Sequence, residues 1–244
     1  MTTQKSIRIY IKDNLAVARD VNLPSDKSHY LCNVMRCKTG DNIVCFNEKN
    51  GEFCAKIVKI DKKCTIIQPQ KQTRSPNNEA DVWLLFAPLK KDNTDFVIEK
   101  STELGVSKII PVITHFTNCD KVKTERFVVQ SIEAAEQCER LSIPQIETAK
   151  KLKDILADWD SKRTLFFMNE RRATDNIVTV FNECKSKSVA LLVGPEGGFS
   201  DEEARFIASF PFVKNVSLGP RILRAETAVV SALAVWQAVK GDWN

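Results

Sequence analysis

The chain has 244 residues, of which 43% are hydrophobic and 27% charged, as is typical of a globular protein with a sizeable core. No apolar run is long enough to cross a bilayer, and the first ten residues lack the apolar core of a signal peptide. We therefore expect a cytoplasmic protein without a membrane partner. The net charge is +5, and the basic excess lies in the first 80 residues, which carry 14 Lys and Arg against 8 Asp and Glu. This asymmetry favours a basic module that binds a polyanion, although a lysine-decorated surface explains it equally well.

Short β-branched and aromatic runs separated by polar turns make up most of residues 1–72. R-I-Y-I, N-I-V-C-F-N, E-F-C-A-K-I-V-K-I and K-C-T-I-I-Q-P are typical of the strands of a small β-barrel or sandwich. One helix interrupts them in P-S-D-K-S-H-Y-L-C-N-V-M-R-C, with Ser25 or Asp26 as its cap. The residues expected on its apolar face are Tyr30, Leu31, Val34 and Met35.

Two polar side chains share one side of this helix. His29 and Arg36 lie seven residues apart, so they project in nearly the same direction. They are candidates for contacting RNA together, and a solvated helix face is the equally weighted alternative.

A polar stretch with two prolines and no apolar periodicity follows, Q-P-Q-K-Q-T-R-S-P-N-N-E-A. Such a stretch predicts a domain boundary. We therefore expect one domain over residues 1–72, a linker over 73–80 and a second domain over 81–244.

Strand and helix patterns alternate throughout the second domain. Apolar runs such as V-W-L-L-F-A-P-L, K-I-I-P-V-I-T and T-L-F-F-M-N are separated by helical patterns. This alternation predicts an α/β domain with a parallel sheet covered on both faces. Ligands bind such sheets at the carboxyl ends of the strands, where Met168, Gly194 and Gly219 fall.

Two of the predicted strands end in glycine-proline loops that lead directly into helices. The first is L-V-G-P-E-G-G-F-S-D-E-E, in which Ser200 and Glu203 have the spacing of a capping box. The second is S-L-G-P-R-I-L-R-A-E-T-A. Two such loops can wall one pocket. The alternative is that Gly197 and Gly198 only permit a tight turn.

The ligand of this pocket is expected to lack a phosphate. Neither common phosphate-binding glycine motif is present. Glu196 would repel a phosphate, but its carboxylate can accept hydrogen bonds from ribose hydroxyls or attract a cation. S-adenosylmethionine has a ribose and a positive sulfur and no phosphate, so it fits these requirements.

The last helix, from about Glu226 to Val239, is apolar almost all round. A helix of this kind is buried on every face. Because it ends the chain, we expect a second subunit to cover it, which makes the protein a homodimer.

The eight cysteines are expected to be buried, reduced thiols. They include no C-x-x-C pair, and the chain has only two histidines. This pattern predicts no metal site.

Several motifs in the same order resemble the RsmE family, ribosomal RNA methyltransferases of the SPOUT superfamily that make 3-methyluridine in 16S rRNA. They are the two glycine loops, E-K-S-T-E-L-G-V with I-I-P-V-I-T, E-A-A-E-Q-C-E-R-L-S-I-P and the ending K-G-D-W. R-I-Y-I and S-H-Y-L-C-N-V-M-R-C-K-T-G-D look like the PUA-like N-terminal domain of that family. The resemblance implies a trefoil knot in the second domain, S-adenosylmethionine in the knot loops, a homodimer, and 16S rRNA or the small ribosomal subunit as substrate.

The resemblance also implies a set of site residues. The methyl group would pass directly to N3 of a uridine, with Arg224 stabilising charge on the uracil oxygens and Glu226 taking the proton or orienting a residue that does. A first-turn acid that favours the helix dipole is the alternative role for Glu226. The cofactor residues would be Met168, Gly194, Glu196, Gly197, Leu218, Gly219 and Leu223. The RNA-binding residues would be Arg8, His29, Arg36 and Arg140, the last of which could instead pair with a neighbouring glutamate.

Three other function classes are compatible with parts of the pattern. One is a SPOUT methyltransferase that acts on a ribose 2′-hydroxyl or on another base. Another is a non-catalytic RNA-binding or ribosome-assembly protein. A nicotinamide oxidoreductase is disfavoured because the dinucleotide fingerprint is missing.

Overall fold

The computed structural model describes residues 7–118, 122–169 and 175–243. It separates into two compact units, which are described in turn. The first comprises residues 1–78 and 135–142, and the second comprises residues 79–134 and 143–244.

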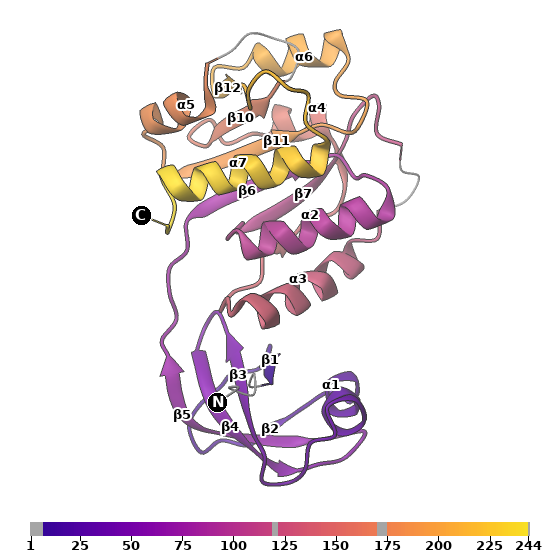
Figure 1. Cartoon of the computed structure of the whole chain (residues 1–244), viewed down its shortest axis with the longest axis vertical. Coiled ribbons are helices and arrows are strands. Elements are labelled where there is room, and N and C mark those ends of the chain that lie inside the picture. The colour runs from indigo at the N-terminus through magenta and orange to yellow at the C-terminus, as the bar shows by residue number, and fades with distance from the viewer. Residues whose placement is uncertain (1–6, 119–121, 170–174, 244) are drawn as a thin grey trace. The chain divides into compact units, whose positions relative to one another are not determined.

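The first unit is built on a five-stranded sheet whose hydrogen-bonded order is β1-β3-β4-β5-β2 (Figure 1). Strand β1 runs parallel to β3, and the other pairs are antiparallel. The paired strands form a half-barrel around a core that includes Ile9, Leu31 and Ile57, which confirms the expected β-rich N-terminal fold. The strands are β1 (Arg8–Tyr10), β2 (Val21–Asn22), β3 (Asn42–Asn47), β4 (Gly51–Lys59) and β5 (Ile66–Arg74).

The helix of this unit differs from its prediction in two ways. It is α-helical only over α1 (Ser25–His29) and continues as a π-helical turn, η1 (Tyr30–Val34). Pro24 occupies the N-cap position and no side chain caps the helix, so the cap predicted at Ser25 or Asp26 is wrong. Ser28 secures the segment instead, because its hydroxyl donates to the Leu23 carbonyl and accepts from the Thr65 amide.

The π-helical turn also explains why the predicted apolar face is not buried. Met35 N–H bonds to the Tyr30 carbonyl, five residues back, so the 3.6-residue spacing behind the prediction does not apply here. Leu31 is fully buried, whereas Tyr30, Val34 and Met35 are 39%, 60% and 39% exposed.

A buried ion pair joins β1 to β4. The Arg8 guanidinium donates to the Glu52 carboxylate at 2.8 and 3.2 Å and lies 4.1 Å above the Phe46 ring centroid. It also donates to the carbonyls of Ala135 and Glu136, which belong to the same unit. The side chains of Arg8 and Glu52 are only 6% and 11% exposed. Removing one partner would leave the other charge buried without compensation.

The second unit is built on a parallel sheet, as the alternating pattern predicted. Its order is β12-β10-β11-β6-β7-β8, and β9 pairs with β7. Every registered pair in it is parallel. The strands are β6 (Asp81–Phe86), β7 (Lys108–Ile113), β8 (Gln145–Ile146), β9 (Lys150–Lys151), β10 (Thr164–Met168), β11 (Ser188–Val193) and β12 (Val213–Val216).

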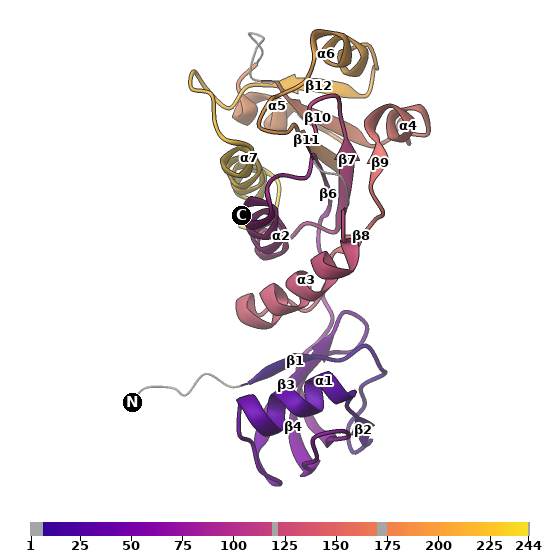
Figure 2. The same ribbon diagram turned by 90° about the vertical axis from the view of Figure 1, so that its right-hand side faces the viewer.

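Helices cover both faces of this sheet. Neighbouring residues of a strand point to opposite faces, and apolar side chains on each face pack against helices. Phe166 packs in the core under α2, α5 and α7, and Phe167 packs in the core under α4 and α6. Figure 2 shows α2 and α7 on one side of the sheet and α4 on the other. The helices are α2 (Lys91–Glu103), α3 (Thr124–Cys138), α4 (Leu152–Ala157), α5 (Ile177–Glu183), α6 (Asp201–Ala208) and α7 (Ala225–Val239). The last residues of α3, from Ala135, belong to the first unit.

Local signals predicted the helix ends of this unit well. The capping box at α6 is confirmed, since Ser200 and Glu203 each accept from the other's backbone amide. Gly105 has a positive φ of 77° where α2 ends. The trefoil knot stays a prediction.

The cysteines among the described residues are free thiols, but they are not uniformly buried. Cys45 is fully buried, and burial, followed by the nearby Cys54, raises its pKa to about 12. Cys64 and Cys138 are exposed because they lie in a turn and at a helix end, so the prediction of burial is wrong for them. Cys119 lies outside the described residues. Within the described ranges no group of His, Cys, Asp and Glu could hold a metal, and no helix is long and apolar enough to cross a membrane.

We expect Glu52→Ala to lower the free energy of unfolding of the first unit by about 3–5 kcal/mol, because it leaves the Arg8 guanidinium buried and unpaired. Amide hydrogen exchange of β3 and β4 peptides measures this unit separately from the other. Gln68→Ala, which removes an exposed hydrogen bond to Asp20, should change the value by less than about 0.5 kcal/mol. If hydrogen exchange in Glu52→Ala were the same as in the wild type, the ion pair of Arg8 with Glu52 would not contribute to the stability of the first unit.

Candidate functional site

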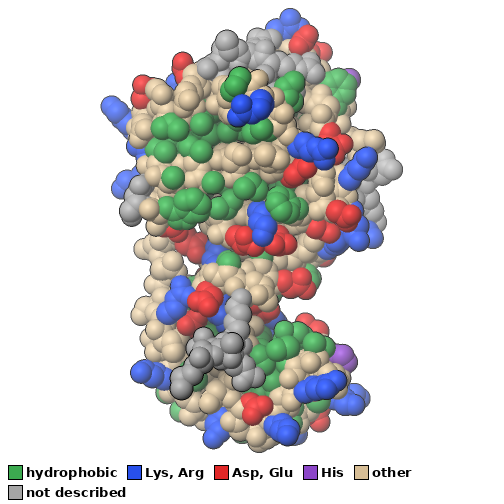
Figure 3. All heavy atoms as spheres, in the orientation of Figure 1, with side chains coloured by type: hydrophobic (Ala, Val, Ile, Leu, Met, Phe, Trp, Pro, Cys, Tyr) green, Lys and Arg blue, Asp and Glu red, His purple; other side chains and the backbone are tan. Residues whose placement is uncertain are grey.

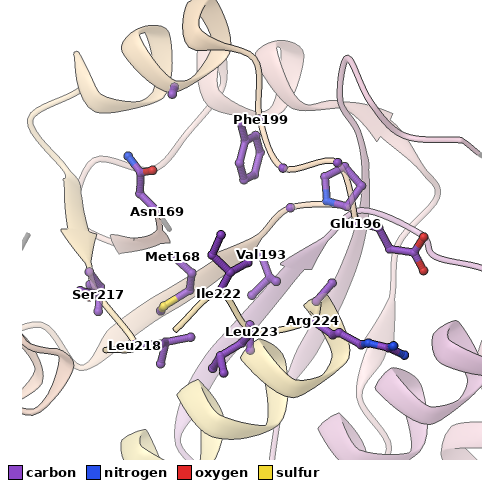
Figure 4. Close-up of a pocket in the computed structure, with 18 of the residues that line it drawn as sticks. Met168, Asn169, Val193, Glu196, Phe199, Ser217, Leu218, Ile222, Leu223 and Arg224 are labelled. Atoms are coloured by element: carbon purple, nitrogen blue, oxygen red, sulfur yellow. The ribbon is translucent and has the colours of Figure 1, made fainter. Parts of the chain in front are cut away.

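A cavity of about 740 Å³ lies at the carboxyl edge of the parallel sheet, where β10, β11 and β12 end. The strand ends, the two glycine loops and the start of α7 line it (Figure 4). Parallel pairing puts these strand ends side by side, since Phe167 pairs with Leu192 and Met168 with Val216. Loops far apart in the sequence therefore meet around one space.

The first glycine loop follows β11 and packs too tightly for larger residues. A β-carbon on Gly194 would lie 2.5 Å from the Phe199 ring, and one on Gly197 would lie 3.1 Å from Cβ of Phe116. Gly198 has a φ of 70°, and its amide bonds to the Pro195 carbonyl. The glycines thus allow both a tight turn and close approach of side chains.

The second glycine loop follows β12. Gly219 has a φ of 104°, and its amide donates to the Ser217 hydroxyl at 3.2 Å. Leu218 and Leu223 present apolar side chains to the cavity. The loop leads to Arg224, the N-cap residue of α7, whose backbone is extended and whose side chain is exposed.

Every residue predicted to bind the cofactor lines this single cavity. These residues are Met168, Gly194, Glu196, Gly197, Leu218, Gly219 and Leu223. In Figure 4 the side chains of Glu196 and Arg224 extend to the same side, away from Asn169 and Ser217.

Several lining residues were missed at the level of sequence. Asn169, Phe199, Ser217 and Ile222 adjoin predicted residues, so the loop motifs themselves could have indicated them. Lys90 has no such signal. It precedes α2, far along the chain from both loops, and only the folded sheet brings it to the cavity.

The two residues predicted for catalysis do not both face the cavity. Arg224 lines it, whereas Glu226 does not belong to the lining. Arg224 is the N-cap residue with an extended backbone, and Glu226 is the second residue of α7, so the two side chains leave the chain from different backbone conformations. The Glu226 Oε2 atom is buried and has no hydrogen-bond partner among the described residues.

The four residues predicted to bind RNA fall into two pairs. His29 and Arg36 are exposed on α1 and just after η1. Arg8 and Arg140 are each 9% exposed, Arg8 in its ion pair with Glu52 and Arg140 donating to the Ser142 hydroxyl at 3.0 Å. Both side chains are thus engaged in contacts within the protein, and their role in RNA binding stays a prediction.

Family models match most of the chain. The RNA methyltransferase domain matches residues 76–237, and the RNA methyltransferase PUA domain matches residues 23–68. The first match contains both glycine loops, and the second contains α1 and the strands β3 and β4.

Relatives that cover nearly the whole chain agree with these matches. Ribosomal RNA small subunit methyltransferase E of Rickettsia conorii is 37% identical, with 93% of each chain covered. Its namesake in Buchnera aphidicola subsp. Schizaphis graminum is 34% identical, covering 96% of this chain and 97% of that one.

Two solved structures share the fold closely. The crystal structure of ribosomal RNA small subunit methyltransferase E from Neisseria gonorrhoeae, bound to S-adenosyl methionine, has a TM-score of 0.87 at 28% identity and covers 98% of this chain and 100% of its own. A putative methyltransferase from Legionella pneumophila, in complex with the bound cofactor, has a TM-score of 0.85 at 30% identity, covering 96% of this chain and 98% of its own. The resemblance in the motifs is confirmed: the chain belongs to the ribosomal RNA small subunit methyltransferase E family, with an RNA methyltransferase domain and a PUA domain.

Proposed function

We propose that this protein transfers the methyl group of S-adenosylmethionine to N3 of one uridine in 16S rRNA of the small subunit, and that it does so in the cytosol. The observation that carries the proposal is the meeting of both glycine loops around one cavity. The relatives named above are small-subunit rRNA methyltransferases, and one solved neighbour is bound to S-adenosyl methionine.

The cavity fits this cofactor. Its apolar side chains, among them Met168, Leu218 and Leu223, suit an adenine ring, while Glu196 can accept hydrogen bonds from a ribose or from an ammonium group. When bound, the cofactor supplies a methyl group on a positively charged sulfur. The loop backbones fix its position, and such alignment contributes a large part of the rate in transfer reactions.

Arg224 and Glu226 are our candidates for the uridine side. Arg224 lines the cavity at the start of α7 and would stabilise negative charge that develops on the uracil oxygens. Glu226 would accept the N3 proton or orient the group that accepts it, because its buried Oε2 atom lacks a hydrogen-bond partner among the described residues. For RNA binding we propose His29 and Arg36, which are exposed.

A homodimer is the second part of the proposal. Figure 3 shows one row of apolar side chains over α7 and another over α2. On α7, Val230, Val235 and Val239 are only partly buried, and on α2 Phe96 is 41% exposed. An isologous contact between two copies would remove this apolar surface from water.

We expect Gly194→Ala to weaken S-adenosylmethionine binding at least about tenfold, since the new β-carbon would displace the Phe199 ring in the cavity wall. Calorimetric titration measures the affinity. Gly40→Ala is the control, because it makes the same exchange in the other unit, at a glycine where a β-carbon would meet no atom within 4 Å. Equal affinity of Gly194→Ala and wild type would contradict the assignment of the cavity.

We expect a strain that lacks this gene to lose 3-methyluridine from 16S rRNA and no other modification. Mass spectrometry of digested rRNA measures this, and the wild-type gene should restore the nucleoside whereas the Gly194→Ala gene should not. If the strain instead lost a 2′-O-methyl group or another methylated base, that position and not uridine N3 would be the target. An unchanged digest would favour a non-catalytic RNA-binding protein.

We expect Glu226→Gln to lower kcat by about 10²- to 10⁴-fold with little change in cofactor affinity, which is the loss typical of a removed general base. Single-turnover methylation and calorimetry measure the two quantities. Glu202→Gln is the matched control. Glu202 is the second residue of α6, as Glu226 is of α7, so each carboxylate lies near the positive end of its own helix dipole. Full turnover by Glu226→Gln would exclude the base role.

A further inference from the structure

An exposed aromatic side chain lies beside the first glycine loop without serving the hydrophobic core. Phe116 follows β7 at the carboxyl edge of the parallel sheet, the edge that also holds the cavity, and it is 44% exposed. His115 packs against it edge to face, with ring centroids 4.6 Å apart and planes at 86°.

The turn that carries Phe116 is held by hydrogen bonds. Thr114 N–H donates to the Thr117 hydroxyl at 2.8 Å, and Thr117 N–H donates back to the Thr114 carbonyl at 3.2 Å. His115 N–H donates at 2.7 Å to Glu203, the residue that also caps α6. The turn that carries Phe116 is therefore tied to the helix that follows the first glycine loop.

The contact between Phe116 and Gly197 places the ring next to the cavity wall. A β-carbon on Gly197 would lie 3.1 Å from Cβ and 3.4 Å from Cγ of Phe116, which is closer than most side chains tolerate. Gly197 itself lines the cavity. The ring thus stands immediately behind a loop of the methyl-transfer site, with nearly half of its surface in solvent.

Chemistry identifies what such a ring can bind. An enzyme that modifies a base within RNA acts on a base removed from its stack, and that base and its neighbours lose their stacking partners. Aromatic side chains replace those partners, and each such contact typically strengthens RNA binding several-fold to more than a hundredfold. An exposed aromatic ring beside a loop of the cavity wall meets this need.

We propose that Phe116 is a stacking platform for an unstacked nucleobase of the RNA substrate, with His115 supporting its ring. This assignment rests on the proposed function and deepens it, because it adds an RNA-positioning residue from the turn after β7 to a site otherwise made by strand ends, the two glycine loops and the start of α7. Phe116 acts on RNA and does not contact the cofactor.

Three variants of the full-length protein test the assignment. Phe116→Leu keeps an apolar side chain against Gly197 but removes the aromatic face, and Phe116→Tyr keeps the face. Phe206→Leu is the matched control, because Phe206 is 41% exposed and packs edge to face on Phe210 rather than on a glycine loop. Each variant is titrated with S-adenosylmethionine and with 16S rRNA or small subunits from cells that lack the gene, and KM for RNA and kcat are measured.

We expect Phe116→Leu to raise the Kd and KM for RNA about tenfold, with kcat and cofactor affinity within about twofold of wild type. Phe116→Tyr and Phe206→Leu should bind RNA like the wild type. Equal RNA affinity of Phe116→Leu and wild type would overturn the proposal, as would loss of cofactor binding in parallel with RNA binding, which indicates a ring that only packs the loop. The proposal would also be overturned if the wild-type protein bound neither 16S rRNA nor small subunits. The expected pattern of RNA affinities without any methylation would sustain the stacking role and reject the proposed function alone.

Discussion

Parallel pairing of β10, β11 and β12 is the constraint on which the site depends. Strands that run in the same direction end at the same edge, so the end of β10 and the loops that follow β11 and β12 line one space. Apolar side chains on both faces stabilise this arrangement, since Phe166 and Phe167 of β10 are buried in the cores on opposite faces of the sheet. A register shift of one residue would exchange these faces and move each loop relative to its neighbours.

Close packing then shapes the loops at this edge. Gly194 makes room for the Phe199 ring, and Gly197 makes room for Phe116, so the two glycines are needed for what approaches them as much as for the turn. Glu203 connects the parts. One carboxylate oxygen accepts from the Ser200 amide and the other from the His115 amide, so the same side chain caps α6 and holds the turn after β7. The cavity wall and the proposed RNA platform thus share one support.

Charge in the first unit has two separate roles. Composition alone indicates a basic surface, but the structure divides the basic residues into exposed and buried groups. His29 and Arg36 face solvent, whereas Arg8 compensates Glu52 inside the unit and also bonds to the carbonyls of Ala135 and Glu136. A count of lysines and arginines therefore overstates the surface available to RNA.

Local sequence determined the longer strands and the helices of the parallel unit, the capping box of Ser200 and Glu203, and the residues of both glycine loops that line the cavity, because turn chemistry and periodicity act over a few neighbouring residues. Tertiary structure alone decided the rest. The burial of Arg8 depends on Glu52, 44 residues away. The separation of Arg224 from Glu226 depends on where α7 begins, and the π-helical turn after His29 moved side chains that α-helical spacing had assigned to the core. The approach of Lys90 to the cavity and of Phe116 to Gly197 depends on strand order, which no local pattern encodes.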